Sequence, residues 1–108
     1  MSERVYISGP VSGLPLDEVR AKFASRERAL VHAGYKVFNP LEKSLKVLGK
    51  GKTWEEYMAF DVLLLLKCDM INFLPGWEDS RGARLEAAIA KTKGISTLFY
   101  TGVRYDQN

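Results

Sequence analysis

The segment 69–88 contains Glu86, the residue of this chain best placed to do chemistry. A short apolar strand is expected at the start of the segment, Pro75 and Gly76 end that strand, and a helix follows. The residues three and four positions from Glu86 in that helix are Gly82, Ala83, Ile89 and Ala90. Residues at this spacing share one helix face, so the Glu86 carboxylate points in the same direction as packing side chains. This placement favours a functional carboxylate over surface decoration.

Two further side chains, Tyr6 and Asp61, could converge on Glu86. Asp61 lies in an apolar helix that ends in a run of leucines, and an acid in so apolar a helix needs a reason. Tyr6 lies in the expected first strand. Two neighbouring carboxylates can do nucleophilic and acid–base chemistry without a metal ion. The pattern alone leaves equally open that Asp61 and Glu86 are exposed helix residues paired with lysine or arginine, and that Tyr6 is an ordinary strand aromatic.

Two loops are expected to meet these side chains. Residues 9–13 follow the first strand, and residues 75–82 lead into the helix that carries Glu86. Ligands of parallel sheets bind at the carboxyl ends of the strands, which brings both loops to one place. A loop that ends at a helix N-terminus also presents N–H donors to an anion or a sugar phosphate. Asp79 and Ser80 have a simpler interpretation as helix N-caps, which is expected for at least one of them.

Composition excludes several classes of site. The single cysteine, Cys68, cannot form an internal disulfide, and His32 is the only histidine. A zinc site and a Ser-His or Cys-His nucleophile are therefore hard to build. We expect metal-free carboxylate chemistry that uses no cofactor.

Length and charge set the broad class of the protein. With 108 residues, 46% of them hydrophobic, the chain is expected to form one domain over residues 1–108. It has no evident targeting segment, and its apolar run over 62–66 is too short to cross a bilayer, so we expect a cytoplasmic protein with no membrane partner. Four lysines cluster over 43–52 without interleaved aromatics, and the net charge is only +3. This favours a solvated loop over a nucleic-acid surface.

The pattern of elements predicts the fold class. Strands are expected over 4–8, 35–38, 69–74 and 94–100, and helices over 17–32, 53–66 and 80–93. The polar connection 39–52 is expected to hold at most a brief helical turn. Apolar strands that alternate with helices indicate a parallel sheet covered on both faces. We therefore predict an α/β fold, a single-domain flavodoxin-like or Rossmann-like three-layer sandwich with a small parallel sheet of about four strands.

Three ordered motifs carry a resemblance to a known family. They are Val5-Tyr6-Ile7-Ser8-Gly9-Pro10, then Asp61 and Asp69 eight residues apart, then Ser80-Arg81-Gly82-Ala83-Arg84-Leu85-Glu86. The set, which spans nearly the whole chain, resembles the nucleoside 2-deoxyribosyltransferase superfamily, and within it the small proteins of the DUF4406 branch. The resemblance implies that Glu86 is the nucleophile at the anomeric carbon of a sugar, that Tyr6 contacts this carboxylate, and that Asp61 assists at the departing base.

The resemblance also implies a substrate site formed by Gly9, Ser80, Gly82 and Arg84. A serine at the position of Ser80 is found in the branch that hydrolyses deoxynucleoside 5′-monophosphates, because a hydroxyl can donate to a phosphate that a carboxylate would repel. Two residues depart from the pattern. Arg84 stands where characterised members have glycine, so it could crowd the sugar or supply charge to a phosphate, and Ser12 stands where the hydrolase branch has arginine.

Two functions of different class remain open. The leading hypothesis is an enzyme that breaks the N-glycosidic bond of a nucleoside or nucleoside 5′-monophosphate, as a hydrolase or as a deoxyribosyltransferase, through a covalent glutamyl-sugar intermediate. The alternative is a non-catalytic nucleotide-binding or sensing module, which an ion pair between Arg84 and Glu86 would favour. A purely structural accessory protein would be favoured if Asp61 and Glu86 faced solvent far apart.

The helix over 53–66 also predicts assembly. It is apolar nearly all round, and Trp54, Tyr57 and Phe60 are expected to form part of an exposed apolar set. In the resembling superfamily a neighbouring subunit completes the site. We therefore predict a homodimer or a larger even homo-oligomer with a two-fold interface on this helix, which brings residues of the neighbour near Asp61.

Overall fold

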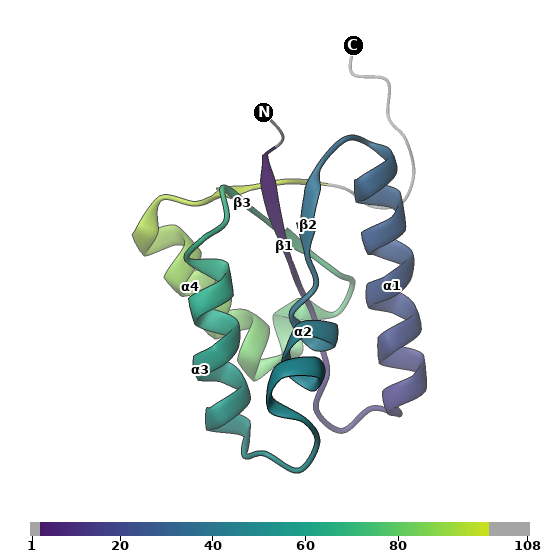
Figure 1. The fold of residues 1–108 in the computed structure, drawn as a ribbon. Coiled ribbons are helices and arrows are strands. Elements are labelled where there is room, and N and C mark those ends of the chain that lie inside the picture. The colour runs from purple at the N-terminus through teal and green to yellow at the C-terminus, as the bar shows by residue number, and fades with distance from the viewer. Residues whose placement is uncertain (1–2, 100–108) are drawn as a thin grey trace.

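The computed structural model describes residues 3–99 and consists of a four-stranded sheet with helices on both faces (Figure 1). The elements in chain order are β1 (Arg4–Ser8), α1 (Leu16–His32), β2 (Lys36–Phe38), α2 (Pro40–Leu48), α3 (Trp54–Leu65), β3 (Met70–Phe73), the 3₁₀ turn η1 (Trp77–Asp79), α4 (Arg81–Lys93) and β4 (Ser96–Thr97). All strand pairs are parallel, and the strand order is β2-β1-β3-β4. The predicted α/β class with a small parallel sheet is confirmed.

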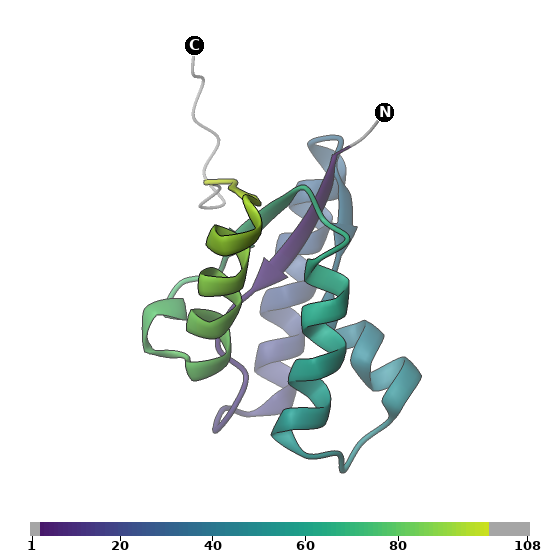
Figure 2. The ribbon, with the colours of Figure 1, turned by 90° about the vertical axis from the view of Figure 1, so that its left-hand side faces the viewer.

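The two faces of the sheet carry separate cores, because alternate residues of a strand point to opposite faces. Val5 and Ile7 of β1 pack with apolar residues of α1, among them Phe23. Tyr6, one residue along β1, packs instead with Leu65 of α3 and with further residues of α3, β3 and α4. Figure 1 shows α1 on one side of the sheet, and Figure 2 shows α3 and α4 side by side on the other. This arrangement is the predicted three-layer sandwich.

Helix boundaries follow the capping signals in the sequence. Thr53 and Glu56 form the predicted capping box at the start of α3, with the Thr53 Oγ1 accepting from the Glu56 N–H at 3.1 Å and the Glu56 carboxylate accepting from the Thr53 N–H at 2.9 Å. Ser80 is the N-cap of α4, where its Oγ accepts from the Ala83 N–H at 3.2 Å. The interpretation of Ser80 as a cap is therefore confirmed.

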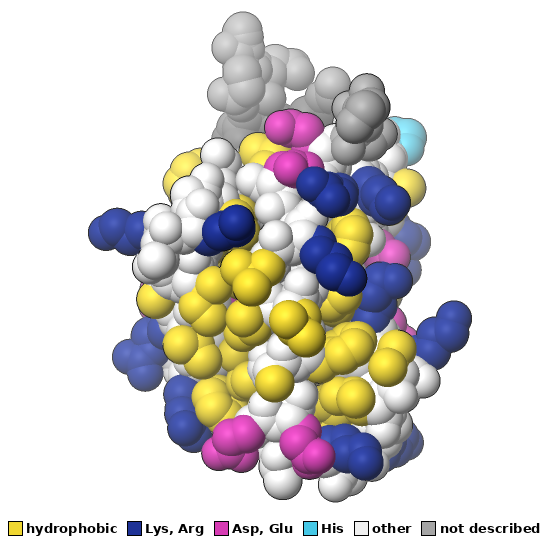
Figure 3. Space-filling model, turned by 60° about the vertical axis from the view of Figure 1, so that its left-hand side comes forward, with side chains coloured by type: hydrophobic (Ala, Val, Ile, Leu, Met, Phe, Trp, Pro, Cys, Tyr) yellow, Lys and Arg dark blue, Asp and Glu magenta, His cyan; other side chains and the backbone are white. Residues whose placement is uncertain are grey.

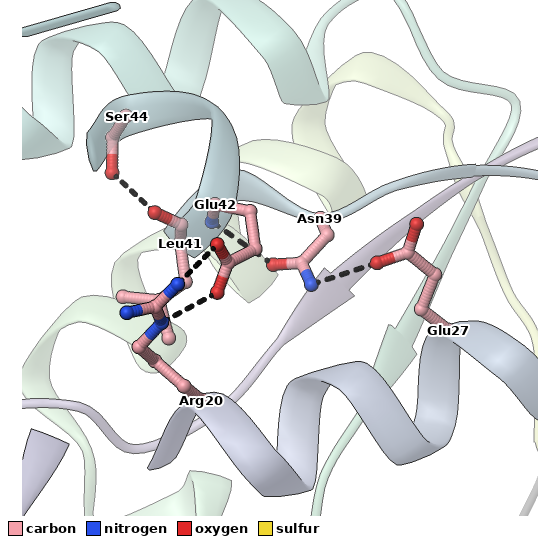
Figure 4. Close-up of polar contacts among 6 residues, drawn as sticks. All are labelled: Arg20, Glu27, Asn39, Leu41, Glu42 and Ser44. Atoms are coloured by element: carbon pink, nitrogen blue, oxygen red, sulfur yellow. Dashed lines mark hydrogen bonds and ion pairs between the residues drawn. The ribbon is translucent and has the colours of Figure 1, made fainter. Parts of the chain in front are cut away.

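The connection 39–52 was predicted incorrectly, since it contains the nine-residue helix α2. Asn39 caps this helix and Pro40 is its first residue, a pairing that favours helix initiation. The helix is held to α1 by polar contacts, which Figure 4 shows. The Arg20 guanidinium donates two hydrogen bonds of 2.9 Å to the Glu42 carboxylate, and the Asn39 amide donates to Glu27 at 2.9 Å. These contacts give α2 tertiary support that propensity alone does not reveal.

The last strand is shorter than predicted. The expected strand over 94–100 is reduced to the two residues of β4, and Tyr100 lies outside the described residues. Leu98 still extends the pairing, since its N–H donates to the Ile71 carbonyl at 2.8 Å. Of the helices within residues 3–99, none combines the length and the apolar character needed to cross a membrane.

Candidate functional site

A cavity of about 350 Å³ lies at the carboxyl end of β1, lined also by residues that follow β2 and by the start of α4. The order of the sheet reverses direction between β1 and β3, and ligands of open parallel sheets bind beside such a reversal. Every helix contributes to its wall. Its lining includes Gly9, Trp54, Asp61, Ser80, Gly82 and Glu86. The structure thus brings both predicted carboxylates and both predicted loops to one cavity.

Glu86 is buried at the floor of this cavity, with 5% of its surface exposed. Each of its carboxylate oxygens accepts a hydrogen bond from a side chain of β1. The Tyr6 hydroxyl donates to Oε2 at 2.5 Å, and the Ser8 hydroxyl donates to Oε1 at 2.6 Å. Tyr6 and Ser8 are two residues apart on a strand, so both side chains point to the face that α4 covers. The carboxylate is therefore fixed in position by two donors.

Burial and hydrogen bonding act on the Glu86 carboxyl in opposite directions. Burial raises its pKa above the ordinary value, and the hydrogen bonds from Ser8 and Tyr6 oppose this rise by stabilising the charged form. Burial, together with the nearby charges of Glu86 and Asp61, raises the pKa of Tyr6 well above its ordinary value. The Tyr6 hydroxyl consequently remains protonated near neutral pH and acts as a donor.

Asp61 supplies the second carboxylate of the cavity. It is mostly buried, and its Oδ1 is the one buried side-chain oxygen or nitrogen among the described residues that has no hydrogen-bond partner. Burial first, and then the charge of Glu86, raises the pKa of Asp61 to about 7. Near neutral pH this group can hold or release a proton. An unpaired buried carboxyl oxygen is costly unless a group from outside the protein pairs with it, and Asp61 lines the cavity from which such a group can reach it.

The alternative interpretation of both acids as exposed and ion-paired is not supported. Neither acid forms an ion pair with a described lysine or arginine. Asp69, the other acid of the resembling motif, does have such a role: its carboxylate pairs with Arg4 at 3.3 Å on the surface. The spacing of Asp61 and Asp69 in the sequence therefore did not indicate that the first lies in a cavity and the second in a surface ion pair.

The glycines of the site have packing roles as well as exposure to the cavity. A Cβ atom at Gly9 would lie 2.8 Å from Cβ of Leu74, so no larger residue fits there without movement of the backbone. A Cβ atom at Gly82 would lie 3.2 Å from the Met58 sulfur, so Gly82 lets α4 approach α3 closely. Ser80 uses its hydroxyl oxygen to cap α4, and the hydroxyl proton remains available toward the cavity.

Arg84, predicted to contact substrate, is exposed and does not line the cavity. Arg84 comes two residues before Glu86, about half a helical turn away, so its side chain points away from the face that Glu86 shares with the buried residues Ala83 and Ala90. The described ion pairs include none between Arg84 and Glu86. The prediction that Arg84 lies at the site is therefore not supported by this geometry.

Two features of the site were missed from the sequence. Ser8 was not among the predicted site residues, although its position two residues after Tyr6 on the same strand could have indicated a second donor. The guanidinium of Arg81 lies 3.9 Å from the centroid of the Trp54 ring, and Trp54 lines the cavity. No local signal predicts this contact, because the two residues begin different helices.

The donor set of the site does not resemble a metal centre. Within residues 3–99 no group of three or more histidine, cysteine, aspartate or glutamate side chains is arranged to hold a metal ion. Carboxyl and hydroxyl groups in one cavity are side chains of the kind that can transfer protons or act as nucleophiles.

Comparison with known proteins gives the family of the chain. No curated protein matches it. One family model, described as a domain of unknown function (DUF4406), matches residues 3–99. This match covers all the described elements, from β1 to β4, and all the residues of the cavity. The chain therefore belongs to the DUF4406 family.

Proposed function

We propose that this protein breaks the N-glycosidic bond of a nucleoside or a nucleoside 5′-monophosphate. The observation that carries the proposal is the pairing of unlike carboxyl groups in one cavity. Glu86 is held by two hydroxyl donors, whereas Asp61 has an unpaired oxygen and a pKa of about 7. Two carboxyl groups whose environments differ in this way can divide the roles of nucleophile and acid.

In the first step a Glu86 oxygen attacks the anomeric carbon of the sugar. The new C–O bond forms as the C–N bond to the base breaks, and the electron pair of that bond leaves on the base nitrogen. Asp61 gives its proton to the departing base. Each Glu86 oxygen accepts one hydrogen bond and retains another lone pair, so the hydroxyls of Tyr6 and Ser8 orient the carboxylate without blocking the attack.

In the second step the glutamyl ester is cleaved at the same carbon. Water, or the nitrogen of a second base, attacks the sugar carbon and the Glu86 carboxylate leaves with the electron pair of the ester bond. Asp61, now deprotonated, takes the proton of the incoming water or base. Water as acceptor gives a hydrolase and a base as acceptor gives a deoxyribosyltransferase.

The resemblance to the nucleoside 2-deoxyribosyltransferase superfamily supports these roles. The residues to which it assigns catalytic roles line or contact the floor of the cavity: Tyr6, Asp61 and Glu86. Gly9, Ser80 and Gly82 line the wall at the ends of β1 and the start of α4, and we propose that they hold the sugar and its 5′ substituent. No cofactor is part of the proposal.

The experiment is to incubate the purified protein with ribonucleosides, deoxynucleosides and their 5′-monophosphates, with and without a second free base, and to measure the base released or exchanged. The proposal predicts release from at least one ligand. Binding of a nucleotide without release would favour the non-catalytic sensing module. The ion pair between Arg84 and Glu86 that favoured this alternative is not among the described contacts.

We also propose that the protein assembles as a homodimer or larger even oligomer through α3. The predicted exposed set is wrong in its membership, because Trp54, Tyr57 and Phe60 are half-buried against the cavity and the core. The exposed apolar residues of the α3–α4 face are Leu63, Leu66 and Leu85. Figure 3 shows hydrophobic side chains gathered on this side of the molecule. A second copy would cover them and place its own residues near Asp61.

Light scattering at micromolar concentration tests this assembly. The wild-type chain is expected at twice the monomer mass or a larger even multiple, and Leu63→Glu is expected to shift it to the monomer. Val47→Glu is the matched control, because Val47 is as exposed on α2 as Leu63 is on α3, at 65% and 63%. A monomeric wild-type chain would contradict the proposal.

A further inference from the structure

The mouth of the cavity carries positive charge that no described carboxylate neutralises. Arg81 is the first residue of α4, and its chain neighbours Ser80 and Gly82 both line the cavity. Lys50 lines the same cavity from the loop between α2 and α3. Both cations are exposed, and neither takes part in an ion pair among residues 3–99.

The Trp54 ring determines where the Arg81 charge lies. Trp54 is the first residue of α3 and lines the cavity, and the guanidinium carbon of Arg81 lies 3.9 Å from the centroid of its ring. Attraction to an aromatic face orients a guanidinium without using a protein acceptor for its N–H groups. The donors of Arg81 are therefore available to a ligand at the mouth.

Charge consequently changes sign along the cavity. The acids Glu86 and Asp61 lie at the buried end and Lys50 lines the exposed end, while Arg81 lies outside the lining, against the ring of the lining residue Trp54. A ligand that matches this arrangement develops positive charge at its buried end and carries an anionic group at its exposed end. A sugar whose glycosidic bond is breaking develops positive charge at the anomeric carbon. The anionic group must lie elsewhere on the same ligand.

We infer that Arg81, positioned by Trp54, selects ligands that carry a phosphoryl group over the same ligands without one. The inference rests on the proposed function, since it takes a sugar at Glu86 as given. Arg81 acts on binding and not on the reacting atoms. A guanidinium forms paired, charge-assisted hydrogen bonds with phosphoryl oxygens, whereas a lysine offers only a point charge.

Binding of ligands to Trp54 can be measured directly. The chain has two tryptophans, so Trp77→Phe leaves Trp54 as the only one and keeps an aromatic ring against Phe73. In this background the emission of Trp54 is titrated with deoxynucleosides, with their 5′-monophosphates and with inorganic phosphate. The monophosphates are expected to bind more tightly than the matching nucleosides and to shift the emission of Trp54.

Arg81→Gln is expected to weaken binding of the monophosphates by about 10- to 100-fold and that of the nucleosides by less than about twofold. Arg81→Lys is expected to be intermediate. Arg28→Gln is the matched control, because it removes the same charge from an exposed position on α1 and is expected to change neither affinity. Thermal melting compares the folding of all variants.

The outcomes separate the inference from the proposed function. Base release by the wild type, together with an unchanged ratio of affinities in Arg81→Gln, overturns the inference and leaves the proposed function standing. Tight binding of inorganic phosphate without a preference for monophosphates over nucleosides also overturns it, since the site then serves a free ion. Failure of the wild type to bind any nucleoside or monophosphate overturns both.

Discussion

The sheet buries a polar cluster on each of its faces, and the two clusters differ in how fully their atoms are paired. On the α1 face, the Arg26 guanidinium donates to Asn72 Oδ1 at 2.7 Å. The Asn72 amide donates in turn to the Leu98 carbonyl at 2.8 Å. Both ends of the Asn72 side chain are therefore satisfied within the protein, and its burial is explained by the stability of the fold.

On the opposite face one buried polar atom has no hydrogen-bond partner among residues 3–99. Glu86 is held by Tyr6 and Ser8, but Asp61 keeps a buried carboxyl oxygen without a partner beside an open cavity. Burial of a polar side chain is common to the two faces and so does not identify a site. The oxygen without a protein partner next to a cavity is the feature that distinguishes the two faces, because only a molecule that enters the cavity, water or a ligand, can supply its missing hydrogen bond.

Replacement of Glu86 by alanine is expected to have the largest effect on base release. We expect Glu86→Ala to lower base release by more than about 10⁴-fold, because no other group can form the sugar ester. The fold should survive, since the change removes a buried charge next to a cavity that admits water. Azide or formate supplied in solution is expected to restore part of the release by replacing the missing carboxylate. Base release that persists in Glu86→Ala would show that the nucleophile is another group.

Replacement of Asp61 by asparagine is expected to have the next largest effect. The asparagine side chain would keep the shape of the aspartate and lose the acidic proton, so base release should fall by about 10²- to 10⁴-fold. In the wild type the release should decline above about pH 7, where Asp61 loses its proton. Ligands whose base is a better leaving group should lose less activity in Asp61→Asn. An equal loss for good and poor leaving groups would contradict the role of Asp61 as the acid.

The same residue predicts how stability depends on pH. Because the pKa of Asp61 rises from 3.8 to about 7 on folding, the folded state holds this proton more tightly than the unfolded state. The contribution of Asp61 to the free energy of unfolding is therefore greatest below about pH 4, and it falls as the pH rises to about 7. Between pH 4 and pH 8 the wild type should lose up to about 4 kcal/mol of its free energy of unfolding through this group, and Asp61→Asn should not show that loss. Denaturant titrations at the two pH values measure the difference.

The sequence predicted most of the helices and strands that form the two polar clusters. It predicted fewer of the contacts between those elements. The strand before Gly9, the capping box at Thr53 and the helix around Glu86 all follow from local signals, and they determine where the cavity lies. Helix α2 was missed because its support comes from α1, through the contact between Arg20 and Glu42. Contacts between elements are set by tertiary packing, which periodicity does not report.

The same reasoning explains why Glu86 is buried in the cavity and Arg84 is exposed outside it. Helical spacing placed Glu86 on the face of Ala83 and Ala90, and that face is buried. Arg84 was assigned to the site by its place in a motif, and the helix turns it to solvent. Leu85, between them, is 41% exposed for the same geometric reason.

The paired cluster on the α1 face should affect stability alone. Asn72→Leu removes the amide oxygen that accepts from the buried Arg26 guanidinium, so we expect a loss of about 2–3 kcal/mol in the free energy of unfolding. Base release per folded molecule should match that of the wild type, because Asn72 does not line the site cavity. Urea titration gives the first quantity and the release assay the second. If the folded Asn72→Leu protein released base more slowly than the wild type, the two faces of the sheet would not differ in function as described.

Ser8 gives the smallest and most specific test, because it is fully buried and acts only through Glu86. Its hydrogen bond favours the charged carboxylate, so Ser8→Ala should raise the pKa of Glu86 and leave less of it ionised at acidic pH. The acidic limb of the pH–rate profile should therefore move to higher pH, and release near neutral pH should fall by about tenfold or less. Ser8→Thr keeps the hydroxyl and should restore the limb, whereas a merely structural role would lower release equally at every pH. Because Tyr6 still donates to the other oxygen, the ester should form in Ser8→Ala, and trapping of the glutamyl sugar would show that Ser8 positions the nucleophile without being one.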